Sequence, residues 1–272
     1  MKIALTHSTL ASYFTRPEDP GYKNNIRTIL KRVRKTGYEA VEMGRPEGFS
    51  SEEFRDMADE VGIKILTAGA LSYTELKGYD FSEWIKECKI LGAPNIMVSN
   101  IDKLVLGNYD ELKKFIRCLS RAGKAFREEG IFLSYHNHAV DFTKINGKTI
   151  FDHILDGTDP DYVKIECDTY WIQAGGGHVI SWLKKLKDRI FVIRLKDYAI
   201  DQYSDHTFLE CTHRRFAEVG EGNLNWPGIL EECLQQGIEW GTVEQDQTQK
   251  PAYESIAISY RNLMGLGALN SA

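Results

Sequence analysis

Apolar, β-rich runs alternate with amphipathic stretches along the whole chain, and this alternation restricts the fold more than any other feature. Eight strand-like runs can be counted within the 272 residues, and each is followed by a helical pattern. The runs occupy residues 2–8, 39–44, 63–71, 95–101, 133–138, 163–168, 191–197 and 241–246. The helices are expected near residues 24–36, 50–61, 80–91, 109–129, 148–156, 177–188, 226–236 and 251–265. Eight βα units at this length predict a single (β/α)8 TIM barrel, an α/β fold, over residues 1–272.

The ends of the predicted helices carry the residues that such ends favour. Ser50 with Glu53 makes a capping-box pattern, and Pro227 and Pro251 stand where a first helical turn tolerates proline. Glycines that fall just after helical runs, as C-terminal caps do, are Gly37, Gly62, Gly92, Gly130 and Gly237. Because no Pro/Gly/Ser-rich linker divides the sequence, we expect one domain.

The last four strand-like runs end in ionisable residues. In a parallel strand alternate side chains face opposite sides, so Lys164, Glu166 and Asp168 share one face of VKIECD while its apolar residues share the other. The same division recurs in LSYHNH, FVIRLKD and GTVEQD. In an open doubly wound sheet, helices cover both faces and the strands are apolar throughout. The charged faces therefore favour a barrel with a shared polar interior that opens onto a pocket.

Composition limits the partners and the compartment. The formal net charge of -5 argues against an extended phosphate-binding surface, so nucleic acid is not an expected partner. The N-terminus lacks a signal-peptide pattern and no segment has the apolar length of a membrane span, which predicts a cytoplasmic protein without a membrane partner. Five scattered cysteines without CxxC spacing are expected to be reduced thiols, namely Cys88, Cys118, Cys167, Cys211 and Cys233.

In a (β/α)8 barrel the C-terminal ends of the strands form one rim, where catalytic groups are expected. His136, His138, Asp168, Glu244 and Asp246 would converge there. Histidines and carboxylates from separate strands suit a divalent metal, which we expect to be Mn2+, Co2+, Zn2+ or Mg2+. A metal on neighbouring carbonyl and hydroxyl oxygens of a polyol stabilises an enediolate, so a carboxylate beside it can move a carbon-bound proton. This is the chemistry of aldose-ketose isomerisation or epimerisation.

Each of these residues also has a purely structural interpretation. Asp168 and Glu244 can form interior salt bridges with basic residues of neighbouring strands, and the two histidines can simply satisfy backbone or carboxylate partners. Glu42 faces inward at the end of the second strand, where it can neutralise Arg45 or Lys196. Because aromatic rings commonly line sugar sites, the residues expected as pocket walls are His7, Trp171 and Trp226.

The later motifs carry a family resemblance. In this order and at these intervals, YHNHAVDF, ECDTYWIQAGG, RLKD, EVGEGNLNW and GTVEQD resemble the xylose isomerase-like superfamily of sugar phosphate isomerases and epimerases. The most similar branch is related to keto-inositol dehydratases. The resemblance implies a (β/α)8 barrel and, in many members, a divalent metal held by carboxylates and histidine from strands five to eight. On this sequence it implies Asp168 and Glu244 as ligands, with His136 at the strand-five position and His138 left open as its alternative.

Two positions depart from the family pattern. Arg194 stands where the family usually has a metal-binding histidine, and a guanidinium has no lone pair to donate. Asp141 stands where glutamate is common. Either the metal is held by three protein groups plus water, or it is lost and Arg194 fills its space. If the metal is present, the guanidinium is expected to turn toward a carboxylate such as Glu166 or Asp168.

We therefore expect a carbohydrate enzyme, an isomerase or epimerase of a small sugar, keto-sugar or polyol derivative. The expected catalytic residues are Glu244, His138 and Lys196, the substrate-binding residues are Glu42, His7, Trp171, Arg194 and Asp246, and the metal ligands are His136, Asp168 and Glu244. A small carbohydrate is the expected partner, and the sequence leaves a homo-oligomer open.

Two alternative functions stay open. The same enediolate can expel a β-hydroxyl instead of regaining a proton, which makes a keto-inositol or keto-sugar dehydratase, a lyase. The chain can also be a non-catalytic sugar-binding protein on a degenerate barrel, for which Arg194 is the main support. A DNA-repair endonuclease on the same barrel is disfavoured, because the ends of the third and fourth strands, around Ala70 and Asn100, have no histidines.

Overall fold

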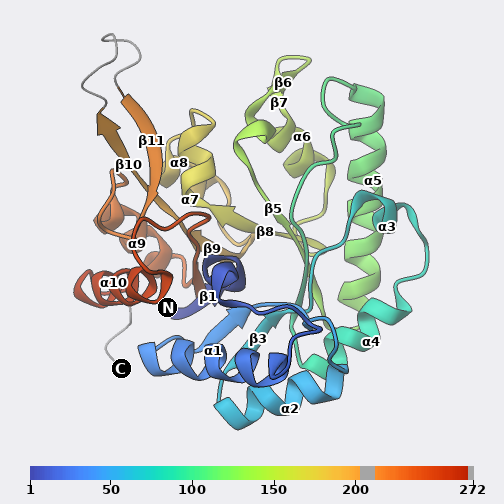
Figure 1. The fold of residues 1–272 in the computed structure, drawn as a ribbon. Coiled ribbons are helices and arrows are strands. Elements are labelled where there is room, and N and C mark those ends of the chain that lie inside the picture. The colour runs from blue at the N-terminus through green and yellow to red at the C-terminus, as the bar shows by residue number, and fades with distance from the viewer. Residues whose placement is uncertain (203–211, 269–272) are drawn as a thin grey trace.

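Eight parallel strands form one sheet that curves into a nearly closed barrel (Figure 1). The structure is a computed structural model that describes residues 1–202 and 212–268. Around the sheet the order is β3-β2-β1-β12-β9-β8-β5-β4. These strands are β1 Lys2–Thr6, β2 Ala40–Glu42, β3 Lys64–Thr67, β4 Asn95–Val98, β5 Phe132–His136, β8 Val163–Asp168, β9 Ile190–Leu195 and β12 Trp240–Val243. The chain just after β3 meets β4 at a parallel bridge between Ala70 and Met97, and the Met97 amide donates to the Gly69 carbonyl at 3.0 Å. The predicted (β/α)8 barrel is confirmed.

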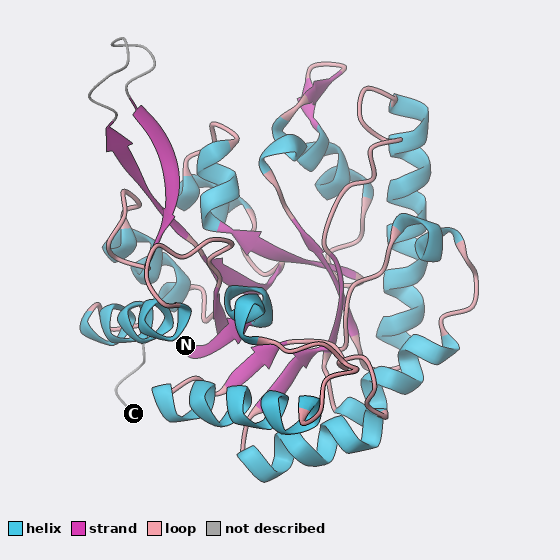
Figure 2. Cartoon of the chain, in the orientation of Figure 1, coloured by secondary structure: helices cyan, strands magenta, loops and turns pink. Residues whose placement is uncertain are grey.

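Helices cover the outside of the barrel between successive strands (Figure 2). They are α1 Tyr22–Thr36, α2 Ser51–Val61, α3 Tyr73–Lys77, α4 Ser82–Leu91, α5 Tyr109–Glu128, α6 Ile150–Gly157, α7 Thr169–Ala174, α8 Val179–Lys185, α9 Trp226–Gln235 and α10 Ala252–Gly265. Every helix expected from the sequence has a counterpart, whereas α3 and α7 are short additions. The first strand is shorter than expected, because a 3-10 helix begins at His7.

Local signals in the sequence fix the ends of α2. The Glu53 amide donates to the Ser50 hydroxyl at 3.0 Å, and the Ser50 amide donates to the Glu53 carboxylate at 2.8 Å. This is the predicted capping box. At the other end Gly62 has a φ of 72°, a left-handed conformation that favours glycine, and its amide bonds the last turn of the helix. Short-range chemistry therefore determines where this βα unit turns.

The barrel interior consists of layers with different character. The layer toward the N-terminal end is apolar and is made of Ala4, Ala40, Leu66, Val192 and Trp240. Two residues further along β1, β2, β9 and β12, the same interior face carries Thr6, Glu42, Arg194 and Thr242, all buried. Side chains of a strand that are two residues apart point to the same side. The polar layer therefore lies at the C-terminal end of the barrel, as predicted.

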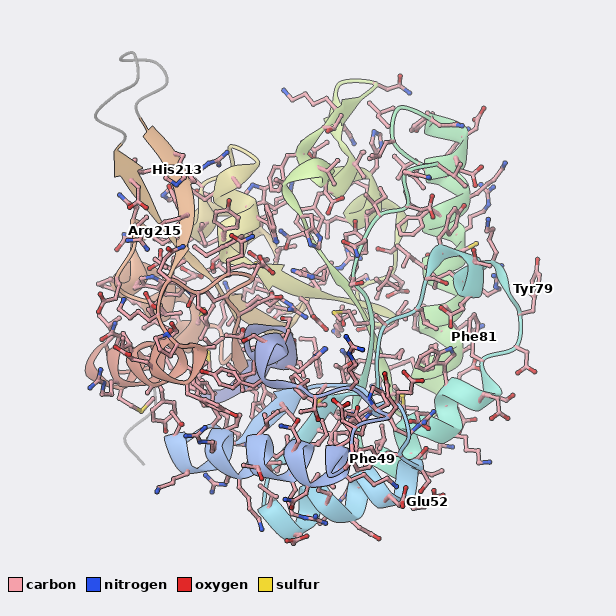
Figure 3. The ribbon with its side chains drawn as sticks, viewed as in Figure 1. Phe49, Glu52, Tyr79, Phe81, His213 and Arg215 are labelled. Atoms are coloured by element: carbon pink, nitrogen blue, oxygen red, sulfur yellow. The ribbon has the colours of Figure 1, made fainter. Side chains whose placement is uncertain are left out.

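Two antiparallel hairpins lie outside the barrel sheet and were not predicted. β10 Asp197–Gln202 pairs with β11 Thr212–Ala217, and β6 Lys144–Ile145 pairs with β7 Lys148–Thr149. His213 and Arg215 lie on β11, in the arm that extends from the barrel (Figure 3). Of the cysteines, four are buried and free, namely Cys88, Cys118, Cys167 and Cys233, while Cys211 lies outside the described residues. Over the described ranges, none of the helices has the length and hydropathy needed to cross a bilayer.

The EVGEGNLNW motif forms a loop around one buried carboxylate. Asp197 accepts hydrogen bonds from the amides of Gly220 and Gly222, at 3.0 and 3.1 Å, and from the Trp226 indole at 2.5 Å. Trp226 is buried by these contacts. The prediction of Trp226 as a pocket wall is therefore wrong, because its ring anchors the start of α9 beneath the loop.

Candidate active site

Arg194 of β9 lies at the centre of a buried cluster of carboxylates. Its guanidinium contacts Glu42 of β2 at 2.8 Å, Glu166 of β8 at 3.0 Å and Glu244, which follows β12, at 2.6 Å. The side chains of Arg194 and Glu42 are each only 2% exposed, and that of Glu166 is fully buried. Charged groups at this depth are stable only when they are paired and hydrogen-bonded. The four strands thus supply one mutually dependent set of charges.

Neutral polar groups complete the hydrogen bonding of these acids. Glu166 accepts from the Ser134 hydroxyl at 2.6 Å and from the Asn95 amide at 3.0 Å. Glu42 accepts from the Thr242 hydroxyl at 3.0 Å. Sequence reasoning missed Asn95, which begins the interior face of β4. The sequence feature that could have identified it is a polar amide residue at the start of an otherwise apolar run.

The partners of Arg194 and Glu42 differ in part from those expected. Arg194 contacts Glu166, as expected, but it also bonds Glu42 and Glu244, and Asp168 is not among its partners in the described structure. Glu42 therefore neutralises neither Arg45 nor Lys196. Arg45 lies outside the barrel and pairs with Glu87 at 2.9 Å.

Three donor groups from the ends of β5, β8 and β12 meet next to Arg194. One ligand atom from each of His136, Asp168 and Glu244 lies within 4.8 Å of the other two. His136 Nε2 is 3.2 Å from Asp168 Oδ2. Glu244 Oε2 contacts Arg194 and Lys196, whereas Oε1 accepts a 3.4 Å hydrogen bond from the Ser8 hydroxyl. One imidazole and two carboxylates form a donor set that fits a divalent cation.

Lys196 contacts two of the three donors, Asp168 and Glu244. Its ammonium is 2.8 Å from Asp246, 3.3 Å from Glu244 and 3.7 Å from Asp168. The Lys196 side chain is 2% exposed, but that of Asp246 is 38% exposed and connects the ammonium with the surface. The ammonium also lies 5.1 Å from the centre of the Trp171 ring. Lys196 is therefore the charged group that links the buried cluster with the rim.

The His138 ring packs between His136 and Trp171, with ring centres 4.4 and 5.3 Å away. Its backbone amide donates to Asp141 at 2.8 Å, which fixes the turn after β5. His138 Nδ1, Trp171 Nε1 and the Asn137 side-chain nitrogen are buried and have no hydrogen-bond partner among the described residues. Buried polar atoms of this kind normally bind something. Of the three residues, His138 and Trp171 are in ring contact, so their unpartnered nitrogens can serve one polar ligand.

Burial and neighbouring charges give the buried carboxyl groups different pKa values. Burial raises the pKa of Glu42 to about 8, although Arg194 acts in the opposite direction. Burial likewise raises the pKa of Asp168 to about 6 against the attraction of Lys196. For Glu244 burial is outweighed by Arg194 and Lys196, which hold the pKa of this carboxyl well below its usual range. Glu244 is thus the most strongly acidic of the three.

The same two effects set the pKa values of the basic groups in the site. Burial lowers the pKa of His136 to about 3 and that of His138 to about 4, so both rings are neutral at pH 7 and have a lone pair to offer. Burial also acts to lower the pKa of Lys196, but Asp168, Glu244 and Asp246 outweigh it and raise that pKa. Lys196 therefore remains an ammonium group.

The balance of charge also suits a cation. Among the described residues, the cluster combines four buried carboxylates, Glu42, Glu166, Asp168 and Glu244, with two buried cations, Arg194 and Lys196. When all are ionised, the cluster has an excess of two negative charges. A divalent cation on the three donors would neutralise that excess.

The remaining predicted residue, His7, lies at the rim. It is exposed, and its Nδ1 is 2.9 Å from the Glu42 carbonyl oxygen. The structure therefore brings ten of the predicted site residues to one end of the barrel, whereas Trp226 does not belong to the site. The ten are His7, Glu42, His136, His138, Asp168, Trp171, Arg194, Lys196, Glu244 and Asp246.

Comparison with known proteins supports the barrel fold. A family model described as xylose isomerase-like TIM barrel matches residues 30–261, most of the chain. An inosose dehydratase of Lacticaseibacillus casei is 27% identical over 252 residues, which cover 84% of both chains. An inosose dehydratase of Mesomycoplasma hyopneumoniae is 25% identical over 247 residues, which cover 82% of both. These relatives confirm the expectation that the chain is an enzyme.

Solved structures share the fold. A sugar phosphate isomerase/epimerase from Parabacteroides distasonis superposes with a TM-score of 0.78 at 22% identity, over 99% of this chain and 95% of that one. An IOLI protein crystallised with a zinc atom superposes with a TM-score of 0.69 at 17% identity, over the whole of both chains. At such identities the likeness concerns the barrel, not its chemistry.

Proposed function

This chain belongs to the xylose isomerase-like TIM barrel family, and from that premise we propose that it is a dehydratase of a small, uncharged keto-polyol such as a keto-inositol. The observation that carries the proposal is the meeting of His136, Asp168 and Glu244, with ligand atoms within 4.8 Å of one another, beside a buried lysine. The curated relatives are inosose dehydratases, which favours water removal over the isomerisation first expected. Dehydration and isomerisation are both reactions of a sugar-modifying enzyme.

In this proposal His136, Asp168 and Glu244 hold a divalent cation, Mn2+, Co2+, Zn2+ or Mg2+. Such a cation, when bound, supplies Lewis-acid polarisation of a substrate carbonyl oxygen. Glu244 is assigned to holding the cation rather than to proton abstraction, because Arg194 and Lys196 both contact its Oε2 and fix that carboxylate in place. Arg194 and Glu42 are positioning residues. Both are 2% exposed, and the guanidinium nitrogens are already engaged with carboxylates, so they hold Glu244 in place instead of touching substrate.

His138 and Lys196 then divide the proton transfers between them. The neutral His138 ring, with its unpartnered Nδ1, takes the proton from the carbon next to the carbonyl. The electron pair left on that carbon forms the new double bond as the β-carbon–oxygen bond breaks. The departing hydroxyl takes a proton from the Lys196 ammonium and leaves as water. Asp246, 2.8 Å from Lys196 and partly exposed, connects the lysine with solvent for reprotonation.

The charges also indicate the class of substrate. Both interior cations are paired with carboxylates, and the cluster as a whole is negative before a metal binds. An added phosphate would meet repulsion there, whereas hydroxyl groups can bond to Asp246, His7 and the indole nitrogen of Trp171. A neutral keto-polyol therefore suits this site better than a sugar phosphate.

The test is an assay of the purified protein with a keto-inositol in deuterated water, with each of the four cations in turn. Loss of one water per molecule, seen by mass spectrometry, is the expected result. Glu244→Gln should slow it by a factor on the order of 100 or more, whereas Glu60→Gln, which alters an exposed glutamate of α2, should not. Calorimetric titration with Mn2+ should show weaker binding to Glu244→Gln, independently of activity.

Isomerisation or epimerisation is the second candidate, because Lys196 and Asp246 can also return a proton to carbon. Deuterium incorporation into the keto-inositol without loss of water would select this reaction. If neither dehydration nor exchange occurs with any of the four cations, while the protein remains folded, both proposals are wrong.

A further inference from the structure

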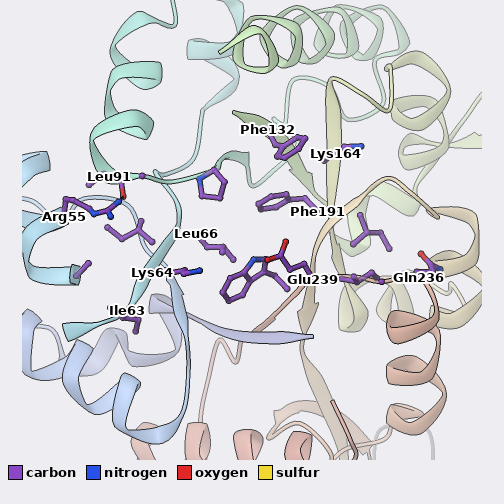
Figure 4. Close-up of a pocket in the computed structure, with 18 of the residues that line it drawn as sticks. Arg55, Ile63, Lys64, Leu66, Leu91, Phe132, Lys164, Phe191, Gln236 and Glu239 are labelled. Atoms are coloured by element: carbon purple, nitrogen blue, oxygen red, sulfur yellow. The ribbon is translucent and has the colours of Figure 1, made fainter. Parts of the chain in front are cut away.

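A hollow lies at the end of the barrel opposite the charged cluster, the N-terminal end (Figure 4). It has a volume of about 630 Å³, which falls within the range of small-molecule sites. Its apolar lining includes Leu66, Phe132, Phe191 and Trp240. Neither the family model nor the charged cluster accounts for it, because catalytic groups of this fold gather at the C-terminal end.

The hollow follows from the apolar layer of the barrel. Trp240 pairs with Val192 in the register of β12 and β9, and it packs with Ala4, Ala40 and Leu66. This layer separates the hollow from the charged cluster. Outside it, the rings of Phe132 and Phe191 lie with their centres 5.6 Å apart. The result is a surface of three aromatic rings, and such rings favour a planar apolar ligand.

Two lysines bring unneutralised charge to this aromatic surface. The Lys64 ammonium lies 5.9 Å from the centre of the Trp240 ring, and the Lys164 ammonium lies 5.9 Å from that of Phe132. Lys164 donates to the Asp188 carbonyl oxygen at 3.2 Å. Neither ammonium has a carboxylate partner within the described ranges. Figure 4 shows that the two lysines come from different strands, with the Phe191 ring between them in this view.

Two other pairs of charges at the hollow are already formed, while the Asp188 carboxylate also lines it without an ion pair among the described residues. Lys2 contacts Glu239 at 2.8 Å, and Arg55 contacts Asp59 at 2.7 Å. The ammonium groups of Lys64 and Lys164 therefore remain to meet a ligand. Aromatic walls with cationic groups at the edge complement a molecule that has a flat apolar body and an acidic group.

We propose that the N-terminal hollow binds a small planar aromatic anion. The rings of Phe132, Phe191 and Trp240 contact its body, and Lys64 and Lys164 contact its acidic group. The site is separate from the proposed dehydratase site and does not depend on it.

Fluorescence titration of the whole protein with 1-anilinonaphthalene-8-sulfonate tests the proposal, with N-phenyl-1-naphthylamine as the matched uncharged probe. The wild type should bind the sulfonate saturably, with one molecule per chain. The double variant Lys64→Gln/Lys164→Gln should bind it about fivefold or more weakly, because two ion contacts are lost, while its affinity for the uncharged probe stays the same. Lys35→Gln/Lys124→Gln, which changes two exposed helix lysines, is the matched control.

Three results would overturn the proposal. The first is equal sulfonate binding by the two double variants. The second is competition by substrate or Mn2+ for the probe, which would place the probe at the other end of the barrel. The third is a dimer in sedimentation that the probe dissociates, because the hollow would then be a contact between two copies of the chain. Trp240→Phe adds an independent readout, since energy transfer from that indole to the bound probe should be lost.

Discussion

The two ends of this barrel differ in chemistry although the same strands build both. At the C-terminal end Glu42, Arg194 and Glu244 form a buried charged cluster, and at the N-terminal end Leu66 and Trp240 form an apolar layer. A step of two residues along a strand keeps a side chain inside the barrel and moves it roughly 6 to 7 Å along that strand, toward the other end of the barrel. That step leads from Val192 and Trp240 to Arg194 and Thr242.

The comparison shows how one barrel separates stability from reactivity. The apolar layer is stabilised by the packing of its side chains and leaves no charge without a partner. A hollow next to it is therefore tolerated. In the charged cluster each group depends on its partners, because a buried charge without a counter-ion is costly. Substitutions should therefore affect turnover and pH response at one end, and mainly packing at the other.

The largest effect is expected from Glu244→Gln. Loss of this anionic ligand should lower kcat by a factor on the order of 100 or more, because electrostatic groups aligned with the reacting atoms contribute effects of that size. Kinetics with a keto-inositol and circular dichroism would measure activity and fold together. Wild-type turnover in this variant would remove Glu244 from the chemistry.

Arg194→Met should produce the largest loss of stability. It leaves Glu42, Glu166 and Glu244 without their shared counter-ion, and breaking a buried pair costs about 3 to 5 kcal/mol. Urea denaturation would measure the change. Arg55→Met, at the N-terminal mouth, is the matched control, since Arg55 is 40% exposed and should contribute little. Similar losses in both variants would contradict the proposed difference between the two ends.

Glu42→Gln should change how stability depends on pH. The folded pKa of Glu42 is about 8 and its ordinary value is 4.5, so between these limits the folded state binds more protons than the unfolded state. Glu42 therefore makes the wild type lose stability as pH rises through this window, by at most about 1.4 kcal/mol per pH unit. The Gln variant stays neutral and should gain on the wild type from pH 5 to pH 8. Parallel stability profiles of the two proteins would show that Glu42 is ionised throughout.

Trp240→Phe should have the smallest effect. The smaller ring leaves a gap in the layer formed with Ala4, Ala40 and Leu66, at a cost of about 1 to 2 kcal/mol in unfolding free energy. Because the charged cluster lies beyond this layer, Mn2+ affinity and kcat should not change. Thermal unfolding and calorimetry would measure both, and a large loss of Mn2+ affinity would show that the two ends are coupled.

Most of the fold could be predicted from the sequence because its signals are local. Alternation in VKIECD placed Glu166 and Asp168 on the inner face of β8, and Ser50 with Glu53 marked the start of α2. The β10 and β11 hairpin was missed, because its strands follow the barrel strand β9 without a periodicity of their own. Trp226 was misplaced for a related reason, since a tryptophan in a loop motif does not reveal that its indole binds Asp197.

The sequence by itself determined the barrel and the end of it at which His136, Asp168 and Glu244 would lie, because strand direction and side-chain alternation are properties of short segments. Only the tertiary structure decided the pairing of Arg194 with Glu42 and Glu244. Those residues lie on strands that are distant in the sequence and become neighbours only when the barrel closes. The same closure decided the aromatic hollow at the N-terminal end, because its rings come from separate strands that no local pattern connects.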